Sequence, residues 1–272
     1  MHLVLLGLIG AFPVCAQAAD NEVIFASLSQ TSPTQRYYIE LLQIAVEEST
    51  EEFGAVTLRN YPTPMDQSRQ IQLLLEGEAD VMWTMSTPER ESELLAVKFP
   101  LINGLLGKRV FLIAKGSQRA FSGLSTQQLR AKVAIQGEGW PDTDILRHND
   151  FTVSSVQWYE WQFGIAKLLL TGTVDYFPRS VIEAEAELAL PHNKGLVIES
   201  QHLLDYPAFI YYFVTPSKPD LQQRLLVGLQ RAEKSGRLQA HFASYPGYHS
   251  ANQLLQQERT IHTLQNPFFP NQ

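Results

Sequence analysis

The sequence predicts an α/β protein that contains two units, each built around its own sheet. Short apolar segments alternate with amphipathic helical segments over residues 23–83, and the same alternation starts again after residue 110. Strands that are separated by helices are typical of parallel sheets. The chain has 272 residues, of which 44% are hydrophobic, so it can form one large core or two smaller ones.

The first alternation begins at residue 23. Apolar segments at 23–26, 55–58 and 79–83 predict strands, and helices are expected over 38–52 and 66–76. In the first helix the apolar residues are spaced three and four positions apart, which places them on one face. Asp66 is placed to cap the start of the second helix, and Gly77 to end it.

The second alternation covers the middle of the chain. Strands are expected at 110–114, 132–135, 151–153, 174–177 and 196–198, and helices at 124–130, 142–147, 161–170 and 182–190. A strand-like aromatic segment, 207–214, then precedes a long helix at 221–234. Because no obvious linker separates the two alternations, we expect two lobes that exchange strands rather than two independent domains.

Composition and charge exclude several classes of partner. The 21 basic residues are fewer than the 28 acidic ones, so no positive surplus is present to neutralise a phosphate backbone, and no nucleic acid is expected. A single cysteine excludes an internal disulfide framework and any multi-cysteine metal cluster. The seven histidines are scattered and no nucleotide-binding loop is present, so neither a metal nor a cofactor is expected.

The N-terminus is typical of a secretory signal peptide. Residues 3–14 are almost wholly apolar, and Ala16-Gln17-Ala18 fits the small-residue cleavage pattern. The apolar segment is shorter than the ~20 residues that span a bilayer. We therefore expect a leader over residues 1–18 and a periplasmic mature chain. A buried first element or a lipid on Cys15 are the alternatives, although the residues before Cys15 do not fit a lipidation signal.

A polar motif follows the strand that ends at Trp83. It contains Ser86, Thr87 and Arg90. In open α/β sheets ligands bind beyond the carboxyl ends of the strands, and a guanidinium beside hydroxyl groups suits a carboxylate or another anion. The alternative is a helix-starting turn, in which a hydroxyl group caps the helix and Arg90 forms a surface salt bridge.

An acidic segment with Glu183, Glu185 and Glu187 is expected to form a solvated helix face. A catalytic interpretation would need two carboxylates that converge on a cleft. Alternate residues of a helix do not face one way.

Three motifs, in this order, resemble the extracellular solute-binding proteins of family 3, the substrate-binding proteins of polar amino-acid ABC transporters. The first comprises Gly77-Glu78-Ala79-Asp80, then Thr87-Pro88-Glu89-Arg90, then Lys98-Phe99-Pro100. The second is residues 129–137, and the third is residues 169–176. The similarity extends over essentially the whole chain after the leader.

The resemblance implies the type II periplasmic binding protein fold. In this fold two lobes, each a mixed sheet flanked by helices, are joined by two crossover strands, and the ligand lies in the cleft between them. Lobe 1 would comprise residues 19–106 plus 207–272, and lobe 2 residues 107–206. The crossovers would fall near residues 103–106 and 204–207.

The resemblance also assigns site residues. Arg90 takes the position of the arginine that clamps a ligand carboxylate, with Ser86 and Thr87 beside it. Gln67 falls where the family often has an aromatic residue that covers the ligand. The loop with Gly137 and Trp140 takes the place of a turn whose N–H groups face the ligand.

The sequence departs from the family where an α-amino group would bind. Ser180 stands where an aspartate is expected, Arg179 precedes it, and Met85 replaces a hydroxyl residue. A buried, unpaired ammonium is costly, so an anionic or polar solute is expected rather than a free amino acid. Arg179 either faces Arg90 across the cleft around an anion or pairs with Glu183, four residues on. The aromatic residues Trp83, Trp140, Tyr176 and Phe177 either stack on the solute or pack in the core.

The leading hypothesis is a monomeric periplasmic protein that binds a small molecule by hinge closure. Its partner would be an inner-membrane ABC permease or a sensor receptor. One alternative is a dehydratase-like enzyme on the same scaffold, for which Glu138 and Asp142 are the candidates for proton transfer. Another alternative is a ligand-sensing protein that has no role in transport.

The leader generates a direct prediction. We expect cleavage after Ala18, because Ala16 and Ala18 supply the small residues that signal peptidase selects. The intact mass of the exported protein should correspond to a chain that begins at Ala19. A mass that retains Cys15 together with a lipid would contradict a soluble periplasmic protein.

Overall fold

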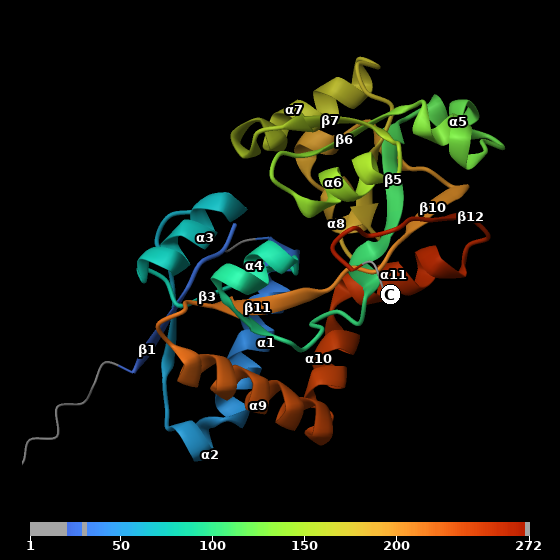
Figure 1. The fold of residues 1–272 in the computed structure, drawn as a ribbon. Helices are drawn as coiled ribbons and strands as arrows, with labels where there is room; N and C mark the ends of the chain where they lie inside the picture. Colours follow the sequence, from blue (N-terminus) through green and yellow to red (C-terminus); the bar gives the residue numbers. More distant parts are fainter. Residues whose placement is uncertain (1–20, 29–31, 270–272) are drawn as a thin grey trace, which may run out of the picture.

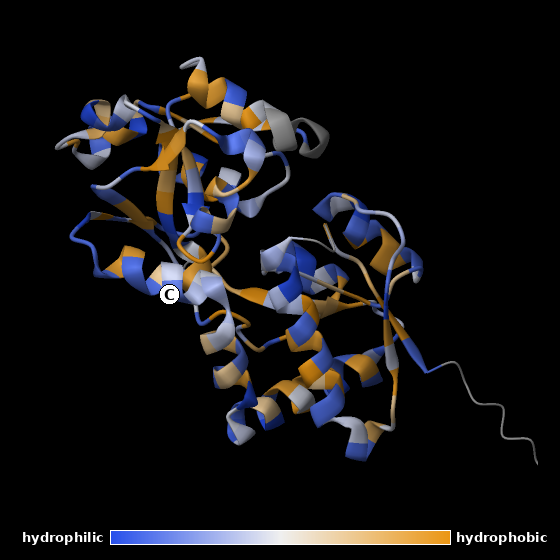
Figure 2. Ribbon diagram, turned by 180° about the vertical axis from the view of Figure 1, so that it is seen from behind, coloured by the Kyte–Doolittle hydropathy of each residue, from blue (hydrophilic) through white to orange (hydrophobic). Residues whose placement is uncertain are grey.

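The computed structural model describes residues 21–28 and 32–269, and the expected leader lies outside these described residues. The chain forms two α/β lobes, which lie beside each other in Figure 1. Strands of both lobes are mostly orange in Figure 2, whereas the helices mix hydrophobic and hydrophilic turns. The lobes therefore have apolar sheets covered by amphipathic helices, as expected for an α/β protein.

The sheet of lobe 1 has the strand order β2-β1-β3-β11-β4. Its strands are β1 (Glu22–Phe25), β2 (Thr57–Asn60), β3 (Val81–Met85), β4 (Leu95–Val97) and β11 (Ile210–Val214). The first three strands are parallel, and β11 pairs antiparallel with both β3 and β4. All five residues of β3 are buried, because the sheet is covered on both faces.

Helices of lobe 1 come from both ends of the chain. They are α1 (Pro33–Glu48), α2 (Thr50–Phe53), α3 (Gln67–Glu76), α4 (Pro88–Glu93), α9 (Pro219–Ser235) and α10 (Arg237–Ser244). Helices α1 and α9 lie against each other (Figure 1). A Cβ atom on Gly228 of α9 would lie 1.9 Å from the carbonyl oxygen of Ala45, so this approach requires glycine. The segment after residue 207 thus returns to lobe 1.

Lobe 2 is built around the long strand β5 (Lys108–Ala114). Its other strands are β6 (Val133–Gly137), β7 (Thr152–Val156), β8 (Phe177–Ser180), β9 (Leu196–Ile198) and β10 (His202–Asp205). Strands β8, β9 and β10 pair antiparallel with β5, while β6 and β7 form a separate parallel pair. The helices are α5 (Thr126–Arg130), α6 (Pro141–His148), α7 (Trp158–Leu170) and α8 (Ala184–Leu188).

Two crossover strands, β5 and β10, join the lobes and pair with each other, which confirms the predicted architecture. They meet very closely, since a Cβ atom on Gly107 would lie 1.8 Å from the carbonyl oxygen of Tyr206. The neighbouring residues Lys108 and Asp205 form a salt bridge of 2.9 Å. The crossovers therefore form one tightly packed connection rather than two separate linkers.

The C-terminal segment departs from the expected boundaries. Helix α11 (Pro246–Gln256) contacts α8 of lobe 2, and β12 (Thr260–Thr263) pairs in parallel with β10. The sequence analysis assigned all of residues 207–272 to lobe 1. The structure instead places α11 and β12 against lobe 2. After α10 the chain turns back along the crossover and closes the edge of the lobe 2 sheet (Figure 1).

A buried hydrogen-bonded pair of histidines ties β12 to lobe 2. His202 Nε2 lies 2.7 Å from the carbonyl oxygen of Phe121, which can only accept a hydrogen bond. Nε2 of His202 therefore carries a proton, and Nδ1 of the same ring lies 2.9 Å from His262 Nε2. The other nitrogen of His262 bonds the hydroxyl group of Thr126 at 2.9 Å. A hydrogen bond between two ring nitrogens requires one of them to be unprotonated, so at least one of the two rings is neutral.

The histidine pair generates a prediction about stability. Burial, with a smaller effect of His202, lowers the pKa of His262 from 6.5 to about 4. As the pH falls from 6.5 to 4, the unfolded chain takes up a proton here that the folded chain excludes. The free energy of unfolding should therefore decrease over this window, by on the order of 2 kcal/mol.

Urea unfolding at pH 7.5 and pH 5 tests this contribution. In His262→Gln the free energy of unfolding should decrease less between these two pH values, because the contribution of this ring is absent. The control is His249→Gln, since His249 is exposed and should leave the decrease unchanged. An equal decrease in the parent and in His262→Gln would show that this ring is not responsible.

Candidate functional site

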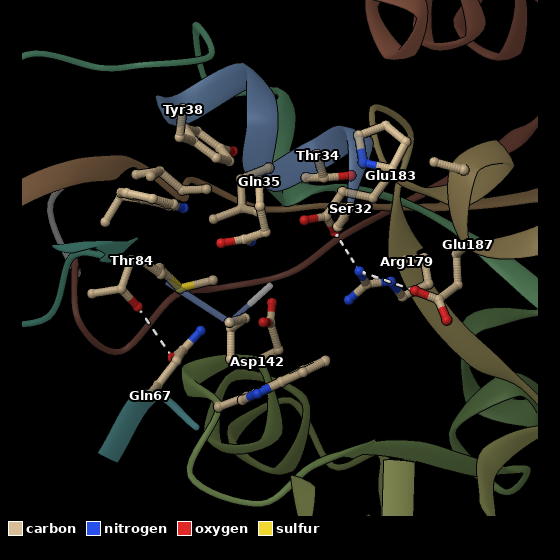
Figure 3. Close-up of a pocket in the computed structure, with 18 of the residues that line it drawn as sticks. Ser32, Thr34, Gln35, Tyr38, Gln67, Thr84, Asp142, Arg179, Glu183 and Glu187 are labelled. Atoms are coloured by element: carbon tan, nitrogen blue, oxygen red, sulfur yellow. Dashed lines mark hydrogen bonds and ion pairs between the residues drawn. The ribbon is translucent and has the colours of Figure 1, made fainter. Parts of the chain in front are cut away.

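A cavity of about 380 Å³ lies between the lobes, and side chains of both lobes line it. Helix α1 and the end of β3 contribute one wall, while α6, β8 and α8 contribute the other (Figure 3). Its volume corresponds to about a dozen molecules of water, at about 30 Å³ each. The cavity can therefore enclose a small organic molecule.

The wall from lobe 1 is aromatic. Trp83 of β3 stacks on Tyr38 of α1, with ring centroids 5.7 Å apart and an interplanar angle of 27°. Thr84, Met85 and Gln35 also line this wall. The cavity lies at the carboxyl end of β3, where Trp83, Thr84 and Met85 line it. The sequence analysis expected a ligand site at this end of the strand.

Arg90 lies behind this wall and does not line the cavity. One of its amino groups, Nη1, donates to the hydroxyl group of Thr84 and to the carbonyl oxygen of Met85, both at 2.8 Å. The other, Nη2, donates to the side-chain oxygen of Gln67 at 3.2 Å. Burial lowers the pKa of Arg90 to about 10, and the carboxylate of Asp142 opposes this effect. Arg90 thus links the end of β3 to the start of α3.

The hydroxyl residues beside Arg90 have local partners. Thr87 caps α4 by accepting a hydrogen bond from the backbone N–H of Arg90 at 3.2 Å. Ser86 donates to the carboxylate of Glu91. Both residues are buried and neither lines the cavity. The helix-starting turn that the sequence analysis kept as an alternative is therefore what the structure shows for Ser86 and Thr87.

A buried ion pair, Arg109–Asp142, forms the part of the lobe 2 wall that is closest to the crossovers. Their side chains are 2.5 Å apart, and the hydroxyl group of Tyr206 donates to Asp142 at 2.6 Å. Burial is the largest single effect on Arg109 and lowers its pKa, but Asp142, Tyr206 and Glu183 together raise the pKa above its usual range. The charge of the guanidinium is therefore compensated within the protein.

A second charged cluster occupies another part of the lobe 2 wall. Arg179 of β8 lies 3.1 Å from the carboxylate of Glu183 and 3.6 Å from that of Glu187. Its guanidinium also lies over the rings of Trp140 and Phe177, at 5.4 and 5.2 Å from their centroids. Figure 3 shows Arg179 between the two carboxylates.

The acidic segment does not form a solvated face, which corrects the sequence analysis. Glu183 and Glu187 are four residues apart and turn toward the cavity, where both carboxylates reach Arg179. Glu185 alone points outward, and its carboxylate accepts a hydrogen bond from Ser250 at 2.8 Å. The spacing of four residues was the signal that could have identified this pair.

Apart from Ser86, Thr87 and Arg90, the predicted site residues fall into three groups. Gln67, Trp83, Trp140 and Arg179 line the cavity. Gly137 borders a separate hollow of about 360 Å³, between its loop and the start of α3. Tyr176 lies in the core of lobe 2, where its ring packs against Phe111 and Phe121.

Several lining residues were not predicted. Tyr38, Gln35 and Thr34 belong to the first turns of α1, a segment with no motif of its own. Arg109 lies on β5 within a buried strand, where an isolated arginine is a signal for a buried ion pair.

Two searches of the described structure gave no site. Over residues 21–28 and 32–269, no three His, Cys, Asp or Glu side chains are grouped so that they could hold a metal ion. Over the same residues, no helix combines the length and the apolar character needed to span a bilayer.

Comparison with known proteins identifies the architecture. No protein-family model and no curated protein matches the sequence. The fold resembles an arginine-specific periplasmic binding protein of Salmonella typhimurium, at 16% identity and TM-score 0.62, with 82% of this chain and 98% of that chain covered. It also resembles a histidine kinase sensor domain that is itself similar to periplasmic binding proteins, at 16% identity and TM-score 0.60, covering 83% and 95%.

A third similar structure is an ancestral amino acid-binding protein described as a precursor of cyclohexadienyl dehydratase. Its identity is 14% and its TM-score 0.60, with 83% of this chain and 95% of that chain covered. Identities this low show the fold alone. The chain therefore has the two-lobed fold of the periplasmic binding proteins, as the three sequence motifs indicated.

Proposed function

We propose that this protein is an exported solute-binding protein that encloses a small polar or charged molecule between its lobes. The observation that carries the proposal is the cavity of about 380 Å³, whose walls belong to different lobes. A molecule in this cavity would be held by aromatic rings from lobe 1 and by charged side chains from lobe 2. Binding would therefore favour the arrangement in which the lobes are close together.

The crossover connection is suited to a hinge motion. Lobe 1 and lobe 2 are joined at the crossing of Gly107 and Tyr206, and the loop that contains Gly139 approaches lobe 1 at the start of α3. There, a Cβ atom on Gly139 of lobe 2 would lie 3.6 Å from the hydroxyl group of Ser68 of lobe 1. Rotation about the crossovers would separate these two residues and open the cavity.

Binding fits the site better than catalysis does. Of the two carboxylates considered for proton transfer, Asp142 is held in a buried ion pair with Arg109 and accepts a hydrogen bond from Tyr206. The other, Glu138, accepts a hydrogen bond from Gln157 at 2.7 Å and does not line the main cavity. A general acid or base has to exchange its proton with the substrate; Asp142 lines the cavity but is engaged by Arg109 and Tyr206, and Glu138 does not line it.

The bound molecule would be passed to a membrane importer or reported to a membrane receptor. Both uses occur among proteins of this fold, since the similar structures include an amino acid ABC transporter substrate-binding protein of Streptococcus pneumoniae and a histidine kinase sensor domain. We propose that the protein acts in the periplasm after its leader is removed. A partner in the inner membrane would recognise the closed form.

Ligand binding should raise the melting temperature of the protein. A thermal-shift screen against amino acids, amines, organic acids, sugars and small peptides should contain compounds that do so, because they bind only the folded state. A ligand at 100 times its Kd adds about 2.7 kcal/mol to the free energy of unfolding. Isothermal titration calorimetry then gives the Kd of each compound that shifts the transition.

Two matched variants test where the ligand binds. Ala186→Trp places a ring in the cavity and should abolish binding, since Ala186 lines it. Ala189→Trp, three residues on and exposed, should bind as the parent does. If no compound shifts the melting temperature, or if both variants bind normally, the cavity is not the ligand site.

The role assigned to Asp142 is tested by stability. Asp142→Asn leaves the guanidinium of Arg109 buried without its counter-charge, so the free energy of unfolding should fall by about 3–5 kcal/mol. Asp144→Asn is the control, because Asp144 is exposed on the same helix and should cost less than about 1 kcal/mol. Urea unfolding measures both. Equal stability of the two variants would contradict a structural role for the pair.

A further inference from the structure

The charged groups that line the cavity are not balanced. Among the described residues, the Asp, Glu, Lys and Arg side chains in its wall are two guanidiniums and three carboxylates. Arg109 and Asp142 neutralise each other in a buried pair, to which Tyr206 adds a hydrogen bond. The remaining guanidinium, that of Arg179, faces both Glu183 and Glu187. This end of the cavity therefore has one negative charge more than it has positive charges.

The surplus charge lies in poorly hydrated surroundings. The side chains of Glu183 and Glu187 are only 14% and 9% exposed. One oxygen of Glu187 accepts a hydrogen bond from Asn193 at 3.2 Å, and Oε2 of Glu183 is buried and lies 3.1 Å from the guanidinium of Arg179, which also pairs with Glu187. Burying a carboxylate without a matching cation is costly. A positively charged ligand would relieve this cost.

The guanidiniums near the cavity already have partners among the described residues. Arg90 donates to Thr84, Met85 and Gln67, and Gln67 also lines the cavity. Arg109 is paired with Asp142, and Arg179 with its two glutamates. An anionic group would compete with these carboxylates and oxygens, whereas a cationic group would be attracted by Glu183 and Glu187.

The aromatic wall also favours a cation. Tyr38 and Trp83 line the cavity from lobe 1, opposite the charged wall of lobe 2. The face of a tryptophan or tyrosine ring attracts an ammonium or guanidinium group, and more strongly where water is excluded. The same rings can pack against the apolar part of the ligand. The carboxylates of lobe 2 and the aromatic rings of lobe 1 therefore both favour a positively charged ligand.

We propose that the cavity takes a small organic cation that lacks a carboxylate, such as a primary amine or a guanidino compound, with its charged group beside Glu183 and Glu187. This inference rests on the proposed binding function and names the class of ligand for the same site. It replaces the anionic solute that the sequence favoured, because the two glutamates supply the carboxylates that the motif comparison found missing.

Matched pairs of compounds test the proposal. Agmatine and arginine, cadaverine and lysine, and tyramine and tyrosine each differ by a single carboxylate. Calorimetric titrations of the purified protein at pH 8 give the Kd of each compound. We expect at least one of the amines to bind ten times or more tightly than its amino acid. Equal or tighter binding of the amino acid in every pair would overturn the proposal.

Two glutamine variants test the location. In Glu187→Gln the surplus negative charge is removed, and binding of the amine should weaken at least tenfold. Glu185→Gln removes a charge from the same helix on its outer side, and binding should be unchanged. The melting temperature of each variant shows that it is folded, and Glu183→Gln serves as the second site variant. Unchanged amine binding in both Glu183→Gln and Glu187→Gln would overturn the assignment.

The outcomes separate this proposal from the proposed function. If organic acids or sugars bind in the cavity and amines do not, the cation proposal fails and the binding function stands. If no compound of any class binds, both fail. A further variant, Gln67→Ala, should free one amino group of Arg90 and improve the binding of the amino acid relative to its amine. An unchanged ratio would contradict the inference that Gln67 competes for Arg90.

Discussion

The buried Arg109–Asp142 pair is the constraint on which the site depends. Arg109 lies on β5 directly after the crossing with Tyr206, and Asp142 lies in the first turn of α6. The hydroxyl group of Tyr206 completes the contact, so the start of one crossover, the end of the other and the helix behind the cavity are held at a single point. The lobe 2 wall can keep its shape because it is fixed to the hinge itself.

The C-terminal segment covers an edge of the lobe 2 sheet. A chain that ended after α10 would leave β10 as an edge strand with unpaired backbone groups. Strand β12 covers that edge, and the histidine pair between β10 and β12 adds a buried hydrogen bond to the pairing. A third strand therefore packs beside the two crossovers.

Apolar periodicity predicted the strands and helices of the two cores well, because burial decides their pattern. Helix α9 shows one buried face in the sequence, and β3 is buried along its whole length. Apolar periodicity did not predict β10 and β12, because their sequences, HLLD and TIHT, place histidine at buried positions that only a partner in space can satisfy. For Tyr176 the alternative of core packing is what the structure shows, since its ring packs against Phe111 and Phe121.

The candidate site shows why a shared position does not carry a shared role. Arg90 keeps its place after β3, but oxygens of Thr84, Met85 and Gln67 satisfy its guanidinium from within the protein. Such partners are invisible in a motif, because they come from α3 and from the strand itself. Opposite it, the cavity gains carboxylates from a helix that follows β8 rather than from the motif position. A few side chains can thus reverse the sign of charge that a cleft prefers while the sheets, the crossovers and the hinge stay as they are.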